Sequence, residues 1–373
     1  MYCGDETGGV VGHVGAHTAR FGYAGEDMPK ADIPSAMGTG GDGGEQKGGD
    51  GAGGRYRVGT PALRHYMDNV AVASPVHQGN VTDWDGMEAL WTHAMKNTLS
   101  VDLQEHPVLL VLSSFASDDT QAKYVQMMFE TFNPPALFVC KEAVMVAFAS
   151  GRSTALVLDS GHSHTQCVPV QDGYVLGRAQ VRSSLAGQAV TERLHESLLG
   201  RGVDVRPHYA FKRVARGGAG RGGAGFDAVP VERESTHPSF ATYHTLDVVR
   251  DIKECVCQMP MIAYNDAVAK QVIPSSYELP DGTVLKLGTE RFEGEKRREG
   301  EEKEKERGHE TTSCAVTCVC VCVCVCVCTR REHLLDVYIR VTPFSVANTH
   351  FWCVPSLPPS LTQCPRSSWI QPC

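Results

Sequence analysis

The residues whose types and spacing best suggest chemistry are Asp159, Ser160 and Gly161. Asp159 ends a short apolar run, and Ser160 and Gly161 follow it. A turn of this kind can present backbone N–H groups to a phosphate while the carboxylate holds a metal ion or a water molecule. An ordinary strand-to-hairpin turn has the same composition, and on their own these three residues favour that simpler interpretation. The motif becomes evidence for a phosphate site only if other motifs accompany it.

Two residue pairs could bind a metal ion, but each has a simpler explanation. His162 and His164 share a face if they lie in a hairpin, because side chains alternate along a strand. No cysteine or carboxylate can be placed beside them from the sequence, so a solvated or cleft-lining pair is favoured. Cys255 and Cys257 lie two apart on an expected helix, where side chains do not face each other, and both are expected to pack.

Two features could contact macromolecules. Trp84 and Trp91, seven residues apart on a helical segment, could anchor a partner, although core packing is favoured. The range Arg213–Gly225 resembles the Arg-Gly-Gly segments that bind single-stranded nucleic acid, but it lacks interleaved aromatic residues. We interpret it as a flexible connector, and the glycine-rich range Gly38–Gly54 as a disordered loop.

Most cysteines lie in one low-complexity tract. Of the 15 in the chain, ten occur at or after Cys314, and six alternate with valine from Cys318 to Cys328. Thiolates in such a tract could bind copper or zinc, yet the paired spacings of zinc ribbons are missing. A GT dinucleotide repeat also alternates valine and cysteine codons, and Glu293–Arg307 contains only residues with purine-only codons. We favour translated non-coding sequence and expect no native fold from about Phe292 onward.

The remainder alternates strand and helix signals, which favours an α/β architecture in two lobes. Asp172-Gly173 between two apolar runs indicates a hairpin, and Pro134-Pro135 ends a helix. We expect strands at 108–112, 136–140, 155–159, 166–170 and 174–176, and helices at 122–132, 143–149, 185–199 and 246–256.

Composition excludes several classes of protein. Among the 373 residues, 42% are hydrophobic and 21% are charged, which argues against wholesale disorder. The formal net charge of -8 argues against bare nucleic acid or an anionic membrane as the main partner. We expect no membrane span and no secretory signal, and the scattered remaining cysteines are typical of a reduced, intracellular protein.

Short motifs occur in a fixed order along most of the chain. They are GYAGED (22–27), HQGNVTDWDGMEALW (77–91), EHPVLL (105–110), MFETFNPPALFV (128–139), ASGRST (149–154), LDSG (158–161), DGYVL (172–176), VVRDIKE (248–254) and SYELPDG (276–282). Together they resemble actin over about residues 1–291, and the chain is identified as a member of the actin family. The opening MYCGDE, both insertions and altered phosphate loops resemble the nuclear actin-related class of chromatin-remodelling and histone-acetyltransferase complexes.

The resemblance implies an α/β fold of the actin-like, ribonuclease H-like type, with a nucleotide cleft between two lobes. The first lobe would comprise residues 1–150, with the insertion at 38–54, and part of the second lobe residues 151–291, with the insertion at 213–225. Residues 292–373 would be a non-native or disordered tail that replaces the rest of the second lobe. The fold would therefore be incomplete at the C-terminus.

The resemblance also assigns the nucleotide contacts. Two hairpin loops would grip the phosphates, the first with Gly15 and Arg20, the second with Asp159, Ser160 and Gly161. Lys253 and Glu254 match the pair that contacts the adenosine. ATP with Mg²⁺ is thus the only cofactor implied, and no catalytic or metal-ligating residue is assigned.

Departures from the family pattern predict loss of ATP hydrolysis. His13 stands where actins carry a carboxylate, Ala16 where they carry a serine, and His162 replaces a second carboxylate. Glu142 takes the place of a water-orienting glutamine, and Gln166 that of a histidine that helps position the same water. Phosphoryl transfer depends on positioning and charge neutralisation, so these changes predict negligible ATPase activity.

The resemblance implies a non-catalytic architectural subunit, in the nucleus and also the cytoplasm. Its partners would be nuclear actin or another actin-related protein, a helical segment of a remodeller ATPase, and histones or the nucleosome through the complex, with no membrane. The alternative is a cytoskeletal actin-like protein that binds ATP and polymerises, which Asp159, Lys253 and Glu254 favour. The glycine-rich insertion, near a loop that makes filament contacts in actin, weighs against polymerisation.

Overall fold

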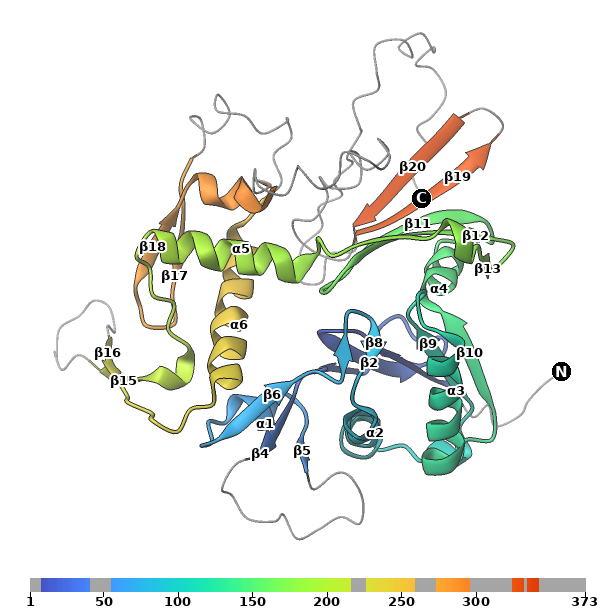
Figure 1. Cartoon of the computed structure of the whole chain (residues 1–373), viewed down its shortest axis with the longest axis horizontal. Coiled ribbons are helices and arrows are strands. Elements are labelled where there is room, and N and C mark those ends of the chain that lie inside the picture. The colour runs from blue at the N-terminus through green and yellow to red at the C-terminus, as the bar shows by residue number, and fades with distance from the viewer. Residues whose placement is uncertain are drawn as a thin grey trace.

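The computed structural model describes residues 8–40, 55–215, 226–258, 273–295, 324–331 and 334–341. The first lobe is built on a five-stranded sheet in the order β10-β9-β1-β2-β3 (Figure 1). Strands β1 and β2 form an antiparallel hairpin, whereas β9 and β10 run parallel to β1. The strands are β1 (Val10–Val14), β2 (Thr18–Tyr23), β3 (Ala31–Pro34), β9 (Val108–Leu112) and β10 (Leu137–Lys141).

Helices α2 (Trp84–Thr92) and α3 (Asp118–Met127) supply the core that covers this sheet. Each begins at a side-chain cap, where Asp83 accepts from the Gly86 N–H and Ser117 accepts from the Thr120 N–H. Trp91 is fully buried and meets Phe21 of β2 edge to face. Trp91 is therefore a core residue, as favoured from the sequence, and partly buried Trp84 packs on Tyr124.

The second lobe contains a sheet in the order β13-β12-β11-β19-β20, with β14 also paired to β12. Its strands are β11 (Ala155–Ser160), β12 (Thr165–Gln171), β13 (Tyr174–Val175), β14 (Val181–Ser183), β19 (Cys324–Arg331) and β20 (Leu334–Val341). Asp172 and Gly173, both with positive φ, form the tight turn between β12 and β13. Helix α4 (Glu142–Ala149) packs its small face, Ala143 and Ala147, onto this sheet and so lies at the junction of the lobes.

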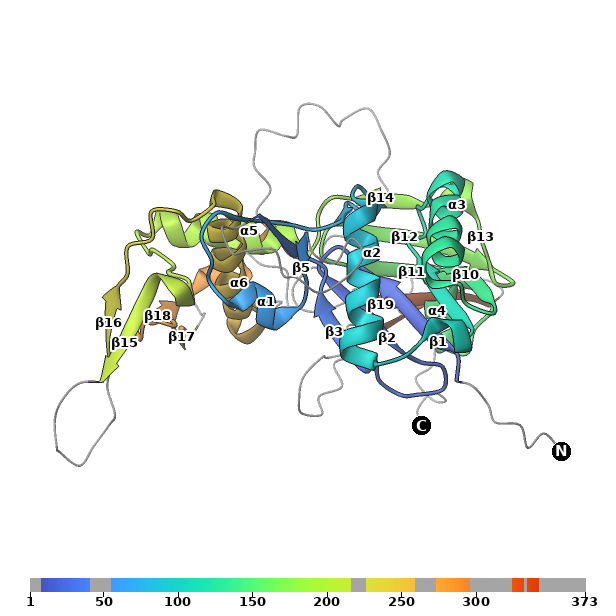
Figure 2. The same ribbon diagram turned by 90° about the horizontal axis from the view of Figure 1, so that it is seen from below.

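Two long helices form the rest of the second lobe. Helices α5 (Gly187–Gly200) and α6 (Pro238–Val256) pack together and against the hairpin of β17 (Ser275–Glu278) and β18 (Val284–Leu287). A second hairpin, β15 (Phe211–Ala215) and β16 (Phe226–Pro230), extends away from the body (Figure 2). Short 3₁₀ segments lie at Gly177–Ala179, His208–Ala210 and Thr289–Glu295.

A small sheet of the first lobe lies beside the N-terminal half of α6 in both views (Figures 1 and 2). It has the order β5-β4-β6 and is flanked by a short helix. The elements are β4 (Met37–Gly40), β5 (Tyr56–Arg57), β6 (Val70–Ala73) and α1 (Thr60–Arg64), followed by the β7 (Val76–His77) and β8 (Asn80–Val81) hairpin. The two lobes thus meet at α4 and again at α6.

The element predictions hold in most places. The strand at 108–112 is confirmed with the same bounds, and the helix at 122–132 begins earlier, at Asp118, and ends in a π-helical segment, Met128–Phe132. Helix α6 starts eight residues before the predicted position, because His237 caps it and Pro238 suits the first turn. A second π-helical segment, His93–Leu99, extends α2, and a 3₁₀ turn spans Leu103–Glu105.

Other sequence expectations need correction or lie outside the described residues. Gly38–Gly40 of the expected disordered loop are part of β4, since they pair with β6, while 41–54 are outside the described residues. Arg213–Ala215 belong to β15, and 216–225 are likewise outside. Cys257 is buried as expected, but Cys255 is exposed, because it lies on the solvent side of α6.

Two strands lie in the predicted tail. Strand β19 pairs antiparallel with β11 on one side and with β20 on the other. The alternation of valine and cysteine is thus compatible with a strand, as period-two patterns are. That the segment is non-native stays a prediction, as do the lobe boundaries at 150 and 291. Among the described residues, no helix combines the length and apolar character that crossing a membrane requires.

Gly12, in the middle of β1, marks the tightest contact of the first core. A Cβ atom at this position would lie 2.2 Å from the Trp91 ring, whereas one at Gly9 would meet nothing closer than 3.6 Å. We expect Gly12→Ala to lower the free energy of unfolding by roughly 1–3 kcal/mol, because Trp91 has no room to move. Urea denaturation measures this, with Gly9→Ala as the control. Equal midpoints for the two variants would contradict the packing described.

Candidate functional site

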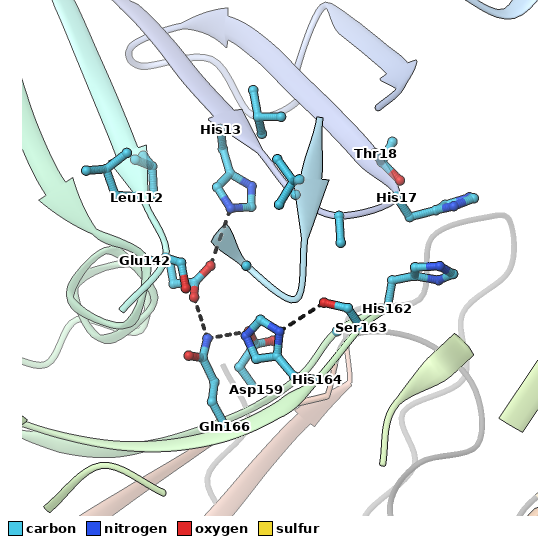
Figure 3. A pocket seen from close by; sticks show the side chains of 18 of the residues that line it. His13, His17, Thr18, Leu112, Glu142, Asp159, His162, Ser163, His164 and Gln166 are labelled. Carbon is cyan, nitrogen blue, oxygen red and sulfur yellow. Dashed lines mark hydrogen bonds and ion pairs between the residues drawn. The ribbon is translucent and has the colours of Figure 1, made fainter. Parts of the chain in front are cut away.

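A cavity of about 400 Å³ lies between the lobes and is lined by the two hairpin turns that the sequence analysis singled out. The β1–β2 turn contributes His13 to Thr18, and the β11–β12 turn contributes Asp159 to His164. The first turns of α4 and the last turns of α6 also line it, together with residues of the β7–β8 hairpin, β9 and α3. The structure therefore brings the predicted phosphate loops face to face across one cleft (Figure 3).

In the first loop, the backbone of Gly15 is bonded on both sides. Its N–H donates to the Thr18 carbonyl at 3.0 Å, and its carbonyl accepts from the Ser35 hydroxyl at 2.7 Å. Arg20 lines the cavity but pairs with Asp32 across β2 and β3 at 3.5 Å. The turn is fixed by its own contacts.

The second loop is also tied into the protein. The Gly161 N–H donates to the His164 carbonyl at 3.0 Å, and the Gly161 carbonyl accepts from the Gly187 N–H at 3.0 Å. The Ser160 hydroxyl bonds to Thr165 at 2.9 Å. These groups make bonds inside the protein at the place where the resemblance expects phosphate contacts.

The floor of the cleft is a network of four side chains that includes three of the departures from the family pattern. Glu142 accepts from the Gln166 amide and from the Ser114 N–H, and its Oε2 lies 3.4 Å from His13 Nε2. The same Gln166 amide nitrogen donates to Asp159 at 3.0 Å. One buried amide thus joins a carboxylate of α4 to a carboxylate of β11, as the dashed lines in Figure 3 show.

The two carboxylates differ in acidity. Burial raises the pKa of Glu142. The hydrogen bond and charge of His13 act in the opposite direction, as do the hydrogen bonds from Gln166 and Ser114, and the pKa of Glu142 is therefore below its ordinary value. For Asp159, burial and the neighbouring Glu142 charge raise the pKa to about 6, and the Gln166 bond offsets only part of this. Glu142 is therefore ionised at neutral pH, whereas the pKa of Asp159, about 6, lies close to neutral pH.

Two imidazole rings meet where the hairpin turns approach each other. The centroids of His17 and His162 lie 4.6 Å apart, and Arg250 of α6 hydrogen-bonds to His17. Burial and the nearby Arg250 lower the pKa of His17 to about 3, and burial and Lys253 lower that of His162 to about 4. Both rings are neutral at physiological pH and in van der Waals contact.

The expected adenosine pair lies on the last turns of α6. Lys253 is buried and donates to the Gly187 carbonyl at 3.1 Å and to the Thr191 hydroxyl at 2.9 Å, which ties α6 to α5. Glu254 is half exposed and lies 3.7 Å from Arg250. Both line the cleft, and their contact with a nucleotide stays a prediction, as it does for Gly15, Arg20, Asp159, Ser160 and Gly161.

These residues do not fit the magnesium–nucleotide group that the resemblance implies. Mg²⁺ requires octahedral oxygen ligands, usually with one or two free carboxylates. Here Asp159 is bonded to Gln166 and has a raised pKa, and no cluster of three or more metal-ligating side chains occurs in the described part of the chain. The rings of His17 and His162 also lie against each other across the two turns, where the resemblance expects phosphate.

Sequence reasoning found the departures but not their mutual contacts. His13, Glu142, Gln166 and His162 were each recognised as replacements, whereas the roles of His17 and Arg250 were missed. A signal was present, because a histidine two residues after Gly15 faces the same cleft as the histidine after Gly161. His162 and His164 line the cleft, as favoured.

The fold and the paired hairpin turns define the class of protein. The family model described as Actin matches residues 4–299, and the chain belongs to the actin family.

Among curated proteins, the chain is similar to several named Actin-related protein 4. Identity is 37% over 313 residues to that of Arabidopsis thaliana, covering 78% of this chain and 69% of the relative. It is 35% over 314 residues to that of Oryza sativa subsp. indica, covering 78% and 70%. For Yarrowia lipolytica it is 29% over 300 residues, covering 78% and 68%.

Because the pKa of Asp159 is raised, its ionisation should lower the free energy of unfolding in a pH-dependent way. The folded state binds this proton more tightly than the unfolded state, whose aspartate titrates near 4, so ionisation lowers stability as pH rises from about 4 to about 6. We expect Asp159→Asn to raise the free energy of unfolding by roughly 2–3 kcal/mol at pH 8 and to have little effect at pH 4.

Urea denaturation at both pH values measures the effect. The matched control is Asp204→Asn, because the Asp204 side chain is 75% exposed. A destabilised Asp159→Asn protein at pH 8 would contradict the assignment.

Proposed function

We propose that the protein is a non-catalytic, actin-related architectural subunit of nuclear chromatin-remodelling or histone-acetyltransferase complexes. Family membership and the similarity to Actin-related protein 4 support the class. The nuclear role follows from the sequence resemblance to that class. The single observation that carries the non-catalytic part is the closed network of His13, Glu142, Gln166 and Asp159 on the cleft floor.

The network argues against hydrolysis because its members are bonded to each other. In actin a glutamine and a histidine orient the attacking water, at the positions of Glu142 and Gln166 here. The Gln166 amide nitrogen makes two bonds, one to each carboxylate, so both of its hydrogens are used. Ionised Glu142 would repel phosphate oxygens at short range. ATP binding is at most weak in this proposal, and Mg²⁺ could accompany it only after rearrangement.

The partners follow from the proposed class. The protein would pair with nuclear actin or another actin-related protein on a helical segment of a remodeller ATPase, and would engage histones through the assembled complex. It would be found in the nucleus and also in the cytoplasm.

The first prediction concerns turnover. The purified chain should release phosphate from ATP no faster than the buffer blank, because Gln166 and Glu142 are bonded to each other and Asp159 is bonded to Gln166. A phosphate-release assay measures this, with conventional actin at the same concentration as the positive control. Hydrolysis at the rate of actin would show that the proposal is wrong about chemistry.

The second prediction concerns assembly. Mixed with nuclear actin and a synthetic helical segment of a remodeller ATPase, the chain should elute as one complex in size-exclusion chromatography. With Mg²⁺, ATP and salt alone it should stay in the supernatant after ultracentrifugation. Sedimenting polymer would instead support the cytoskeletal alternative.

A further inference from the structure

We infer that the chain holds its cleft closed with its own side chains, by contacts between the lobes at the floor, at the phosphate turns and at the mouth, so that closure does not depend on a nucleotide. This concerns the cleft itself and goes beyond the proposed function, since it holds for any complex that the protein joins. The three contacts involve different residues and different kinds of interaction.

At the floor, the link is the Gln166 amide. Ser114 follows β9 of the first lobe, Glu142 begins α4 at the junction of the lobes, and Gln166 and Asp159 belong to the second-lobe sheet. The amide is fully buried and joins Glu142 to Asp159, and Glu142 also accepts from the Ser114 N–H. Separating the lobes would therefore break a charge-assisted hydrogen bond at Glu142, from Ser114 or from Gln166. It would also leave ionised Glu142 with one partner fewer.

At the phosphate turns, the link is the ring pair. His17 comes from the first lobe, whereas His162 and Arg250 come from the second. The rim adds a further bond across the lobes, from the Arg182 guanidinium to the Gln78 carbonyl in the β7–β8 turn. The imidazoles meet across the two turns, and they are neutral, so they can lie against each other without charge repulsion.

At the mouth, an aromatic cluster joins the small sheet to α6. Tyr66 of the first lobe stacks on Tyr209 at 5.2 Å and meets Phe240 edge to face at 5.7 Å. Phe240 is buried against Leu63, Val70 and Val72 of the first lobe. Figure 1 shows α1 and β6 beside α6, and α1 again lies beside α6 in Figure 2. Opening the cleft would expose this apolar surface to water, which is unfavourable.

Hydrogen bonds across the mouth surround the aromatic cluster. The Val72 N–H donates to the Ser239 hydroxyl at 2.8 Å, and the Asn69 N–H donates to the Ser235 carbonyl at 2.8 Å. His244 bonds to the Leu63 carbonyl at 3.1 Å. Two backbone amides of the first lobe thus have their acceptors in the second lobe, and they report directly on whether the lobes are together.

A ligand shifts a conformational equilibrium only by its differential affinity for the two states. Where the chain's own contacts already favour the closed state, a nucleotide adds nothing to closure and must displace His17 and His162 to enter. A partner would then meet the closed shape at all times.

Hydrogen exchange of the Asn69 and Val72 amides in the full chain tests the inference. In the protein alone, both amides should exchange at least about a hundredfold more slowly than unprotected amides, and MgATP should change their rates by less than about twofold. Fast exchange in the protein alone that MgATP slows about tenfold or more would overturn the inference.

Two variants test the contacts separately. Phe240→Ala should speed exchange of both amides about tenfold or more, whereas Tyr174→Ala, which removes an aromatic ring that is 78% exposed and away from the cleft, should not. His162→Gly leaves the mouth intact and should increase the affinity for MgATP, measured by displacement of a fluorescent ATP analogue. If Phe240→Ala does not fold, the wild-type rates and His162→Gly still decide. Unchanged affinity in His162→Gly would show that the ring pair does not block the turns.

Discussion

The interaction on which the cleft depends is the pair of hydrogen bonds from the Gln166 amide to Glu142, at the junction of the lobes, and to Asp159 of the second-lobe sheet. Glu142 and Asp159 are both partly buried, and two carboxylates side by side away from water are unstable without neutralisation. In the family pattern a bound cation is expected between the phosphate loops. Here the Gln166 amide gives each carboxylate one N–H, and the His13 imidazole faces Glu142. Asp159, the carboxylate that the family pattern retains in the second loop, therefore serves the protein's own architecture.

This interaction makes the departures at the cleft interdependent. Glu142 in place of glutamine would be a buried charge without compensation if His13 had remained a carboxylate, since two like charges would then face each other. Gln166 in place of histidine provides the two donors on one nitrogen that bridge the carboxylates. Each replacement alone would weaken the cleft floor. Together they form a bonded set, which is why their effect on chemistry and on closure has to be considered jointly.

The sequence was sufficient for the family, for the two-lobe α/β architecture and for most elements, because ordered motifs and local periodicity carry that information. The strand at 108–112 needed only its apolar run and its turn signals. The start of α6 at Pro238 was missed, since its N-terminal half packs on the small sheet of the other lobe and its pattern depends on that contact. From the sequence, the site was predicted only as a set of replacements that remove ATP hydrolysis. Its contacts could not be predicted, because the register that places His17 against His162 is set by the approach of two hairpins far apart in sequence.

A cleft that the chain's own contacts hold closed is consistent with a role that needs a fixed shape rather than a cycle of nucleotide binding and release. An enzyme that hydrolyses nucleotide gains from a cleft whose opening is governed by the ligand, because binding and release then alternate. A subunit that others assemble on gains from a surface that does not change with nucleotide state, since each conformational change would lower the fraction of binding-competent protein. The aromatic cluster around Phe240 adds nothing to phosphate chemistry, yet it buries apolar surface between the lobes. It is therefore best explained as a structural link, and it supports the same conclusion as the cleft floor by a separate physical route.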